Sequence, residues 1–287
     1  MRRRDFLALS GAAAGLAGLA GCAGPAGTRT LPTPLPDEPG LPSGSTYRLG
    51  EEAGAELTAV AVLNARVRRS DHYRTESGAL DVYAPPDSHL VSARVTARGE
   101  QRPPLSAFEL RVGEETYPAL SSVDGRPPSA VLSRYEAYRQ DAEPAPDGSR
   151  VMFEVPAGST GEPVAVVWSP SGGDPAYWPL RDQQRAALGQ PLPPLTVEGF
   201  ETPATAAPDA DPTATLRASN SGEVDTTLRA ALNYAGAVDA SETLSEPVPA
   251  GETVTAEYGL PWNGQRLDVE LAWAGSHEQR TIEPESG

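Results

Sequence analysis

The chain of 287 residues contains no lysine, one cysteine, three histidines and two methionines. A single cysteine excludes a disulfide framework, a thiolate zinc site and an iron–sulfur cluster. All 23 basic residues are therefore arginines, and because 39 residues are acidic the net charge is −16. Nucleic-acid binding depends on cations that neutralise phosphates, so we expect no nucleic-acid partner.

Motifs of common enzyme classes are also missing. The sequence has no Gly-x-Ser-x-Gly nucleophile elbow, and no glycine-rich phosphate loop or dinucleotide fingerprint follows a predicted strand. The serine at position 159 lies between glycines in a segment typical of a turn. We therefore predict no catalytic residues and no cofactor.

Metal ligands are sparse. A catalytic metal site needs several ligands at close spacing, whereas the three histidines are His72, His89 and His277. The acid–histidine pairs at 71–72 and 87–89 would have to meet across a sheet, and exposed loop positions are the simpler interpretation. Calcium suits so acidic a chain better, but residues 209–211 lack the glycine and the distal glutamate of an EF-hand. We predict no metal site.

Long apolar runs are absent beyond the N-terminus, so no transmembrane helix is expected. Residues 1–21 have a basic start, a weakly apolar middle rich in Ala, Gly and Leu, and small residues before a break. This is the pattern of a signal peptide, and it is too short and too weakly apolar to span a membrane.

Two motifs refine the signal-peptide prediction. The start of the chain resembles a twin-arginine export signal in four residues: Arg3, Arg4, Phe6 and Leu7. The end of the segment resembles the lipobox of prokaryotic lipoproteins: Leu19, Ala20, Gly21 and Cys22. In such lipoproteins the cysteine becomes the mature N-terminus and carries lipid on its sulfur, since a thiolate is a good nucleophile. An ordinary secretory signal with a chance cysteine is the alternative.

Removal of residues 1–21 takes away three arginines and one aspartate, which leaves a net charge of −18. Such charge repels itself in dilute buffer and is screened in strong salt. Many acids without lysine resemble the proteins of halophilic archaea. A GC-rich genome would explain the missing lysine but not the acidity. We expect the acids to solvate the surface rather than to form a binding site.

Residues 22–46 are rich in proline and threonine, which predicts an extended tether after the lipidated cysteine. Residues 47–194 contain short apolar or alternating runs between glycine and proline turns, which favours strands. These runs are 57–67, 91–98, 108–112, 116–120, 151–155 and 163–168. The turn after residue 112 predicts a hairpin, and helical spacing occurs at 131–140 and 180–188.

Residues 195–287 have strand candidates that begin near 195, 212, 226, 242, 252, 266 and 278. Asn263 and Gly264 carry a strong hairpin signal, which would pair 253–260 with 266–273. The core must rely on packing that includes Leu271 and Trp273. We predict an all-β chain with two immunoglobulin-like β-sandwiches in tandem and short helical insertions in the first.

Longer stretches resemble known families. "FELRVGEETYPAL" and "VMFEVPAGSTGEPVAVVWS" resemble the telokin-like (DUF4352-type) modules of secreted prokaryotic lipoproteins, over about half of the first region. "TATLRASNSGEVDTTLRAALNY" and "PVPAGETVTAEYGL" resemble the CARDB-type adhesive modules of archaeal surfaces, over most of the second. The resemblance implies immunoglobulin-like domains without catalytic residues.

One basic segment stands out in the acidic chain. It supplies a candidate binding patch of six residues: Arg66, Arg68, Arg69, His72, Tyr73 and Arg74. Arg and Tyr suit an interface with an anionic glycan, a lipid headgroup or an acidic partner. Pairing with the chain's own acids is the alternative, and we favour it because surface ion pairs are common.

The sequence thus predicts a protein lipid-anchored to the outer face of the cytoplasmic membrane, with its membrane contact through Cys22. We expect a non-catalytic binding, adhesive or structural module of the cell envelope with a protein or glycan partner. An accessory subunit of a membrane complex or transporter is the alternative, and an extracytoplasmic metal-dependent hydrolase is the weaker one.

Overall fold

The structure is a computed structural model that describes residues 34–35, 40–55, 58–99, 102–123, 138–140, 148–236 and 238–285. Residues Leu31–Gly287 belong to one compact unit. The predicted signal peptide, the lipobox with Cys22 and most of the tether lie outside the described residues. So do residues 131–137 of the first expected helix.

β-Strands dominate the described residues, which contain one α-helix, α1 (Asp182–Leu188), and one 3-10 turn, η1 (Leu105–Ala107). The predicted all-β, immunoglobulin-like sandwich class is confirmed. α1 confirms the helix expected at 180–188, and Gly189 follows it in a right-handed conformation with a φ of −72°.

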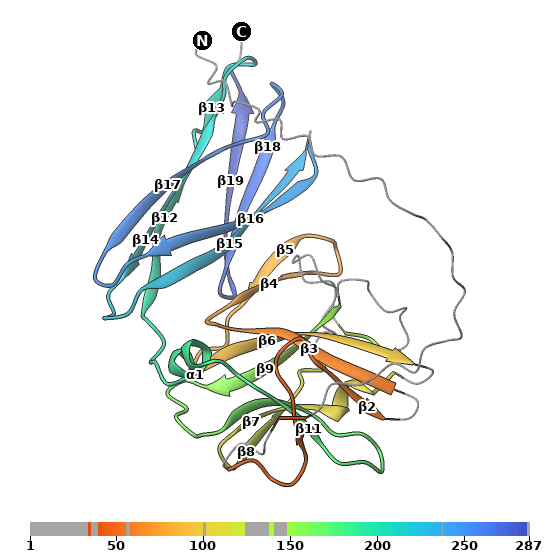
Figure 1. The fold of residues 1–287 in the computed structure, drawn as a ribbon. Helices are drawn as coiled ribbons and strands as arrows, with labels where there is room; N and C mark the ends of the chain where they lie inside the picture. Colours follow the sequence, from red (N-terminus) through yellow and green to blue (C-terminus); the bar gives the residue numbers. More distant parts are fainter. Residues whose placement is uncertain are drawn as a thin grey trace, which may run out of the picture. The chain divides into compact units, whose positions relative to one another are not determined.

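The first sandwich packs two sheets face to face (Figure 1). One sheet is antiparallel, in the order β2 (Glu52–Ala55), β3 (Thr58–Arg68), β6 (Ser88–Gly99) and β9 (Ser149–Pro156). The other has the order β1 (Ser45–Thr46), β11 (Ala176–Pro179), β10 (Val164–Trp168), β7 (Phe108–Val112) and β8 (Glu115–Pro118). Only β1 is parallel to its neighbour, β11.

Side-chain alternation explains how these sheets enclose a core. In β7, Phe108, Leu110 and Val112 are buried and the residues between them are less so. Gly113 turns the chain into β8 with a φ of +61°, a conformation that glycine adopts without steric cost. The hairpin predicted after residue 112 is therefore confirmed.

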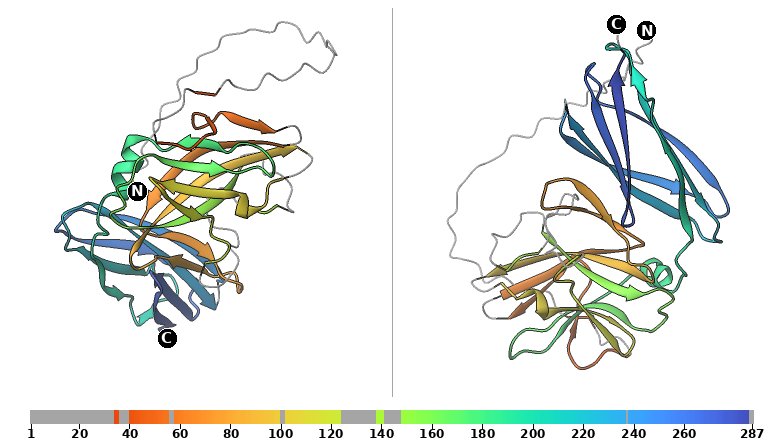
Figure 2. Two further views of the ribbon diagram at one scale, coloured as in Figure 1. Left: turned by 90° about the horizontal axis from the view of Figure 1, so that it is seen from below. Right: turned by 180° about the vertical axis from the view of Figure 1, so that it is seen from behind.

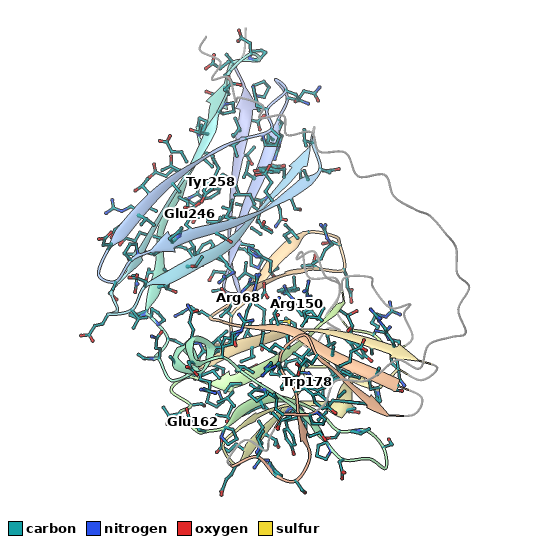
Figure 3. The ribbon with its side chains drawn as sticks, in the orientation of Figure 1. Arg68, Arg150, Glu162, Trp178, Glu246 and Tyr258 are labelled. Atoms are coloured by element: carbon teal, nitrogen blue, oxygen red, sulfur yellow. The ribbon has the colours of Figure 1, made fainter. Side chains whose placement is uncertain are left out.

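Trp178 of β11 is the largest side chain that is fully buried (Figure 3). Its ring stacks on Tyr47 with the centroids 5.8 Å apart. Its Nε1 donates to the carbonyl oxygen of Glu51 at 3.0 Å, so the only polar atom of the indole is satisfied.

The second sandwich also has two sheets, which can be followed in Figures 1 and 2. The smaller has the order β12 (Leu195–Glu201), β14 (Thr213–Asn220) and β17 (Thr253–Gly259). The larger has the order β13 (Thr205–Ala206), β19 (Ser276–Pro284), β18 (Leu267–Trp273), β15 (Thr226–Gly236) and β16 (Ala240–Val248). Seven strands begin within two residues of the predicted starts, and the short β13 was not predicted.

The hairpin predicted at Asn263 and Gly264 is wrong. β17 pairs with β14, whereas β18 pairs with β15 and β19, so the turn carries the chain from one sheet to the other. Asn263 Oδ1 accepts from the backbone of Gln265 at 3.2 Å, and Gly264 has a φ of +79°. These local features serve a crossover as well as a hairpin, and therefore the dipeptide does not reveal which strands pair.

Candidate functional site

A separate two-stranded sheet joins the described strands of the two sandwiches. It consists of β4 (Asp71–Arg74) and β5 (Leu80–Tyr83), and it contacts β15 and β18 within the compact unit. Leu80 is 1% exposed and clusters with Ala231 and Ala272. β15 places large residues such as Leu232 in its own core, and Ala231 points the other way. A small outward residue lets the hairpin approach closely.

Polar side chains fix this contact. Asn233 Oδ1 accepts from the backbone nitrogen of Leu80 at 2.8 Å, and its Nδ2 donates to the Leu80 carbonyl oxygen at 2.9 Å. The side-chain amide thus takes the place of a neighbouring strand. On β4, His72 Nε2 lies 2.8 Å from the carbonyl oxygen of Ala230. Because a carbonyl only accepts, Nε2 carries the proton.

An ion-pair cluster lies at the start of the hairpin. Asp71 accepts from Arg150 at 2.6 Å on one carboxylate oxygen and from Arg68 at 3.1 Å on the other. Figure 3 labels the two arginines. The side chains of Asp71 and Arg150 are only 4% and 7% exposed. Arg66 and Arg229 also act on this cluster through their charges. In this arginine cluster the guanidinium groups of Arg68 and Arg150 contact one carboxylate, and two further arginines act through their charges alone.

Burial changes the ionisation of these groups. Burial is the main cause that lowers the pKa of Arg229 to about 10, and the nearby charge of Arg68 adds to it. Burial also lowers the pKa of Arg69 and Arg150 from the usual value. Arg229 stays protonated at neutral pH. The site is therefore a concentration of partly desolvated positive charge.

A cleft of about 390 Å³ opens beside the cluster. Its polar lining includes six residues: Arg68, Arg69, His89, Thr226, Thr227 and Arg229. The Arg69 guanidinium donates to the carbonyl oxygen of Pro193, and His89 Nε2 lies 2.9 Å from the carbonyl oxygen of Gln190. These contacts hold two lining side chains in place. We call this feature the arginine cleft.

The predicted binding patch is divided between two places. Arg66, Arg68 and Arg69 belong to the cluster and the cleft, and only Arg66 among the six patch residues is exposed. His72 and Tyr73 are buried in the hairpin. Arg74 is partly buried and donates to the carbonyl oxygen of Gly78. The sequence favours pairing of these residues with the chain's own acids over an interface with a partner. Arg68 pairs in this way with Asp71.

Two histidines differ from the expectation of exposed loop positions. His72 lies in β4 and His89 in β6, and they are 8% and 6% exposed, since each forms part of a sheet packed by other elements. His277 is in β19, where its side chain is partly exposed. Across the described ranges no group of three or more His, Cys, Asp or Glu residues is arranged to hold a metal ion.

The sequence interpretation missed the partners that complete the site. Arg150, Arg229 and Asn233 are separated from the basic segment by about 80 to 160 positions. A signal existed in β15, where an outward face of Arg, Ala and Asn replaces the exposed acids common elsewhere in this chain. Such a face indicates cover by another element, but it does not say which one.

The sequence matches no protein-family model and no curated protein. Within the part of the chain that is described, no helix is long and apolar enough to cross a membrane.

We predict that Asp71→Asn destabilises the protein by about 3–5 kcal/mol, because it leaves Arg68 and the buried Arg150 without the carboxylate that pairs with both of them. Asp182→Asn is the matched control, since the Asp182 side chain is 94% exposed in its pair with Arg185 and such pairs contribute about 0–1 kcal/mol. Chemical denaturation measures both. Equal losses would contradict a structural role for the cluster.

We also predict that stability falls as the pH drops below about 6.5. Burial lowers the pKa of His72 below 6.5 in the folded state, so the unfolded chain binds the proton more readily. The contribution of His72 is complete above pH 6.5 and is lost as the pH falls towards the depressed pKa. Thermal unfolding is measured between pH 7.5 and pH 5, roughly the window of a perturbed histidine. Over this range the midpoint temperature should fall less in His72→Gln than in the wild type. Parallel curves would refute this assignment.

Proposed function

We propose that the protein is exported, anchored by lipid on Cys22 to the outer face of the cytoplasmic membrane, and acts there as a non-catalytic binding, adhesive or structural module of the cell envelope. The observation that carries the proposal is the position of the only cysteine. It follows residues 19–21, which resemble a lipobox, and it lies downstream of an arginine pair that resembles an export signal.

The residues after Cys22 support an anchored protein. A diether or diacyl lipid supplies two chains, which are enough for stable anchoring where one is marginal. The proline-rich segment that follows favours an extended spacer between the membrane and the compact unit. The net charge of −18 that remains after residues 1–21 suits a salty exterior.

The described part of the chain supports binding rather than catalysis. Both sandwiches consist of strands whose inward residues fill apolar cores, and the hairpin β4–β5 ties them together. Three arginines line the cleft beside their contact, together with His89, Asp225 and two threonines, and arginine side chains are suited to recognising anions. Fold alone does not fix function, so the proposal depends on the cleft and on the N-terminal motifs.

Membrane fractionation in strong salt tests the proposal. We predict that the wild-type protein sediments with membranes and dissolves only in detergent, whereas Cys22→Ser is released in soluble form. Thr28→Ala, a conservative change in the tether, should fractionate like the wild type. Soluble protein in all three preparations would contradict lipid anchoring.

The same preparation separates the remaining roles. Purification of the tagged wild type from detergent should recover the protein without a stoichiometric membrane subunit. Recovery of such a subunit, weakened in Cys22→Ser, would instead identify an accessory subunit of a membrane complex.

A further inference from the structure

The arginine cleft concentrates positive charge in a strongly acidic chain. Arg68 and Arg69 reach it from the end of β3, and Arg229 reaches it from the outward face of β15. The chain as a whole has a net charge of −16. Three guanidinium groups at one cleft are therefore unexpected from the acidic composition of the chain, and they need a local explanation.

The carboxylates near the cleft are already used. One oxygen of Asp71 pairs with Arg150 and the other with Arg68. Asp225 also lines the cleft, but it is exposed and its Oδ1 accepts from the backbone nitrogen of Ala250 at 3.0 Å. Neither of these two acids forms a salt bridge with Arg229.

Arg229 is a cleft arginine that has no counter-ion in contact with it among the described residues. Its guanidinium makes no hydrogen bond or salt bridge with any of the residues that the structure describes, although it is partly buried. The neighbouring charges of Arg68, Arg66 and Arg150 act against its protonation, and the charge of Asp71 acts for it. A partly desolvated cation among other cations is costly unless an anion completes the site.

We propose that the arginine cleft is an oxyanion-binding site whose ligand presents a carboxylate, sulfate or phosphate group to Arg229, Arg68 and Arg69. Guanidinium groups are planar forks of N–H donors that match the oxygens of these anions, which a spherical chloride does not. The hydroxyl groups of Thr226 and Thr227 add further donors at the same cleft.

The rest of the lining sets the size and character of the ligand. A volume of about 390 Å³ falls within the range of about 300–1,000 Å³ typical of small-molecule sites. Apolar walls come from six residues: Val67, Ala187, Pro191, Pro193, Val224 and Pro247. A compact ligand with an acidic head and a small carbon skeleton fits this lining better than a bare ion does. This step rests on the proposed binding role, but it does not depend on the lipid anchor.

Calorimetric titration of the purified Cys22→Ser protein with sodium sulfate, and separately with sodium glucuronate, tests the proposal. The background is about 1 M potassium chloride, which shortens the Debye length to about 3 Å and suppresses diffuse attraction. We expect saturable binding of one anion per chain. Glucose, the neutral counterpart of glucuronate, should not bind.

The decisive variant is Arg229→Gln. It should weaken anion binding about tenfold or more, as expected for the loss of a charge-assisted hydrogen bond. Without anion its thermal midpoint should equal or exceed that of the parent, because the change relieves repulsion among the arginines. Arg217→Gln is the matched control, since Arg217 is an exposed β14 residue paired with Glu198, and it should bind like the parent.

The outcomes separate clearly. Tighter binding of glucuronate than of sulfate supports a ligand with a carbon skeleton, and equal binding supports recognition of the oxyanion alone. No saturable binding by the parent protein, or equal weakening by Arg229→Gln and Arg217→Gln, would overturn the proposal. Since the titrated protein has no lipid anchor, failure here is distinct from failure of the fractionation experiment. Arg229→Lys, which keeps the charge but loses the fork, provides a second variant and should bind more weakly than the parent.

Discussion

The contact between the β4–β5 hairpin and the outward face of β15 is the interaction on which the candidate site depends. Leu80 fits against Ala231 and Ala272, and Asn233 bonds both backbone groups of Leu80. The contact requires small side chains on β15, because a larger residue in place of Ala231 would displace the hairpin. It also sets Arg229, on the same face of the strand, beside the arginines at the end of β3.

Positive charge is concentrated at one place in an otherwise acidic chain. Acidic residues outnumber basic ones by 16, yet Arg68 and Arg150 both pair with the buried carboxylate of Asp71, and the charges of Arg66 and Arg229 act on the same cluster. The pair between Asp71 and Arg150 is shielded from salt because both side chains are buried. Salt screens the repulsion among the exposed acids more strongly than it screens the attraction within this cluster. The proposed anion site would therefore keep its charge contacts in strong salt better than the exposed acids do.

Much of the fold could be predicted from local pattern, because one buried face imposes alternation on each strand. β7, β14 and α1 are found where the sequence places them. The strand pairing at Asn263 could not be predicted, since the turn chemistry is the same for a hairpin and a crossover. The basic segment was recognised, but Arg150 and Arg229 join it only through tertiary packing. Local patterns do not report which distant strands meet. The N-terminal motifs stand on sequence alone.

Amide hydrogen exchange at Leu80 measures whether the β4–β5 hairpin is docked on β15 in solution. Its backbone nitrogen donates to Asn233 Oδ1 rather than to β4, so it is protected only when the hairpin is docked on β15. We predict that the Leu80 amide exchanges as slowly as amides inside β15 and becomes fast in Asn233→Ala, while the amides of β7 stay protected. A Leu80 amide that exchanges as fast as that of Ser77 at the exposed tip of the hairpin would contradict the account.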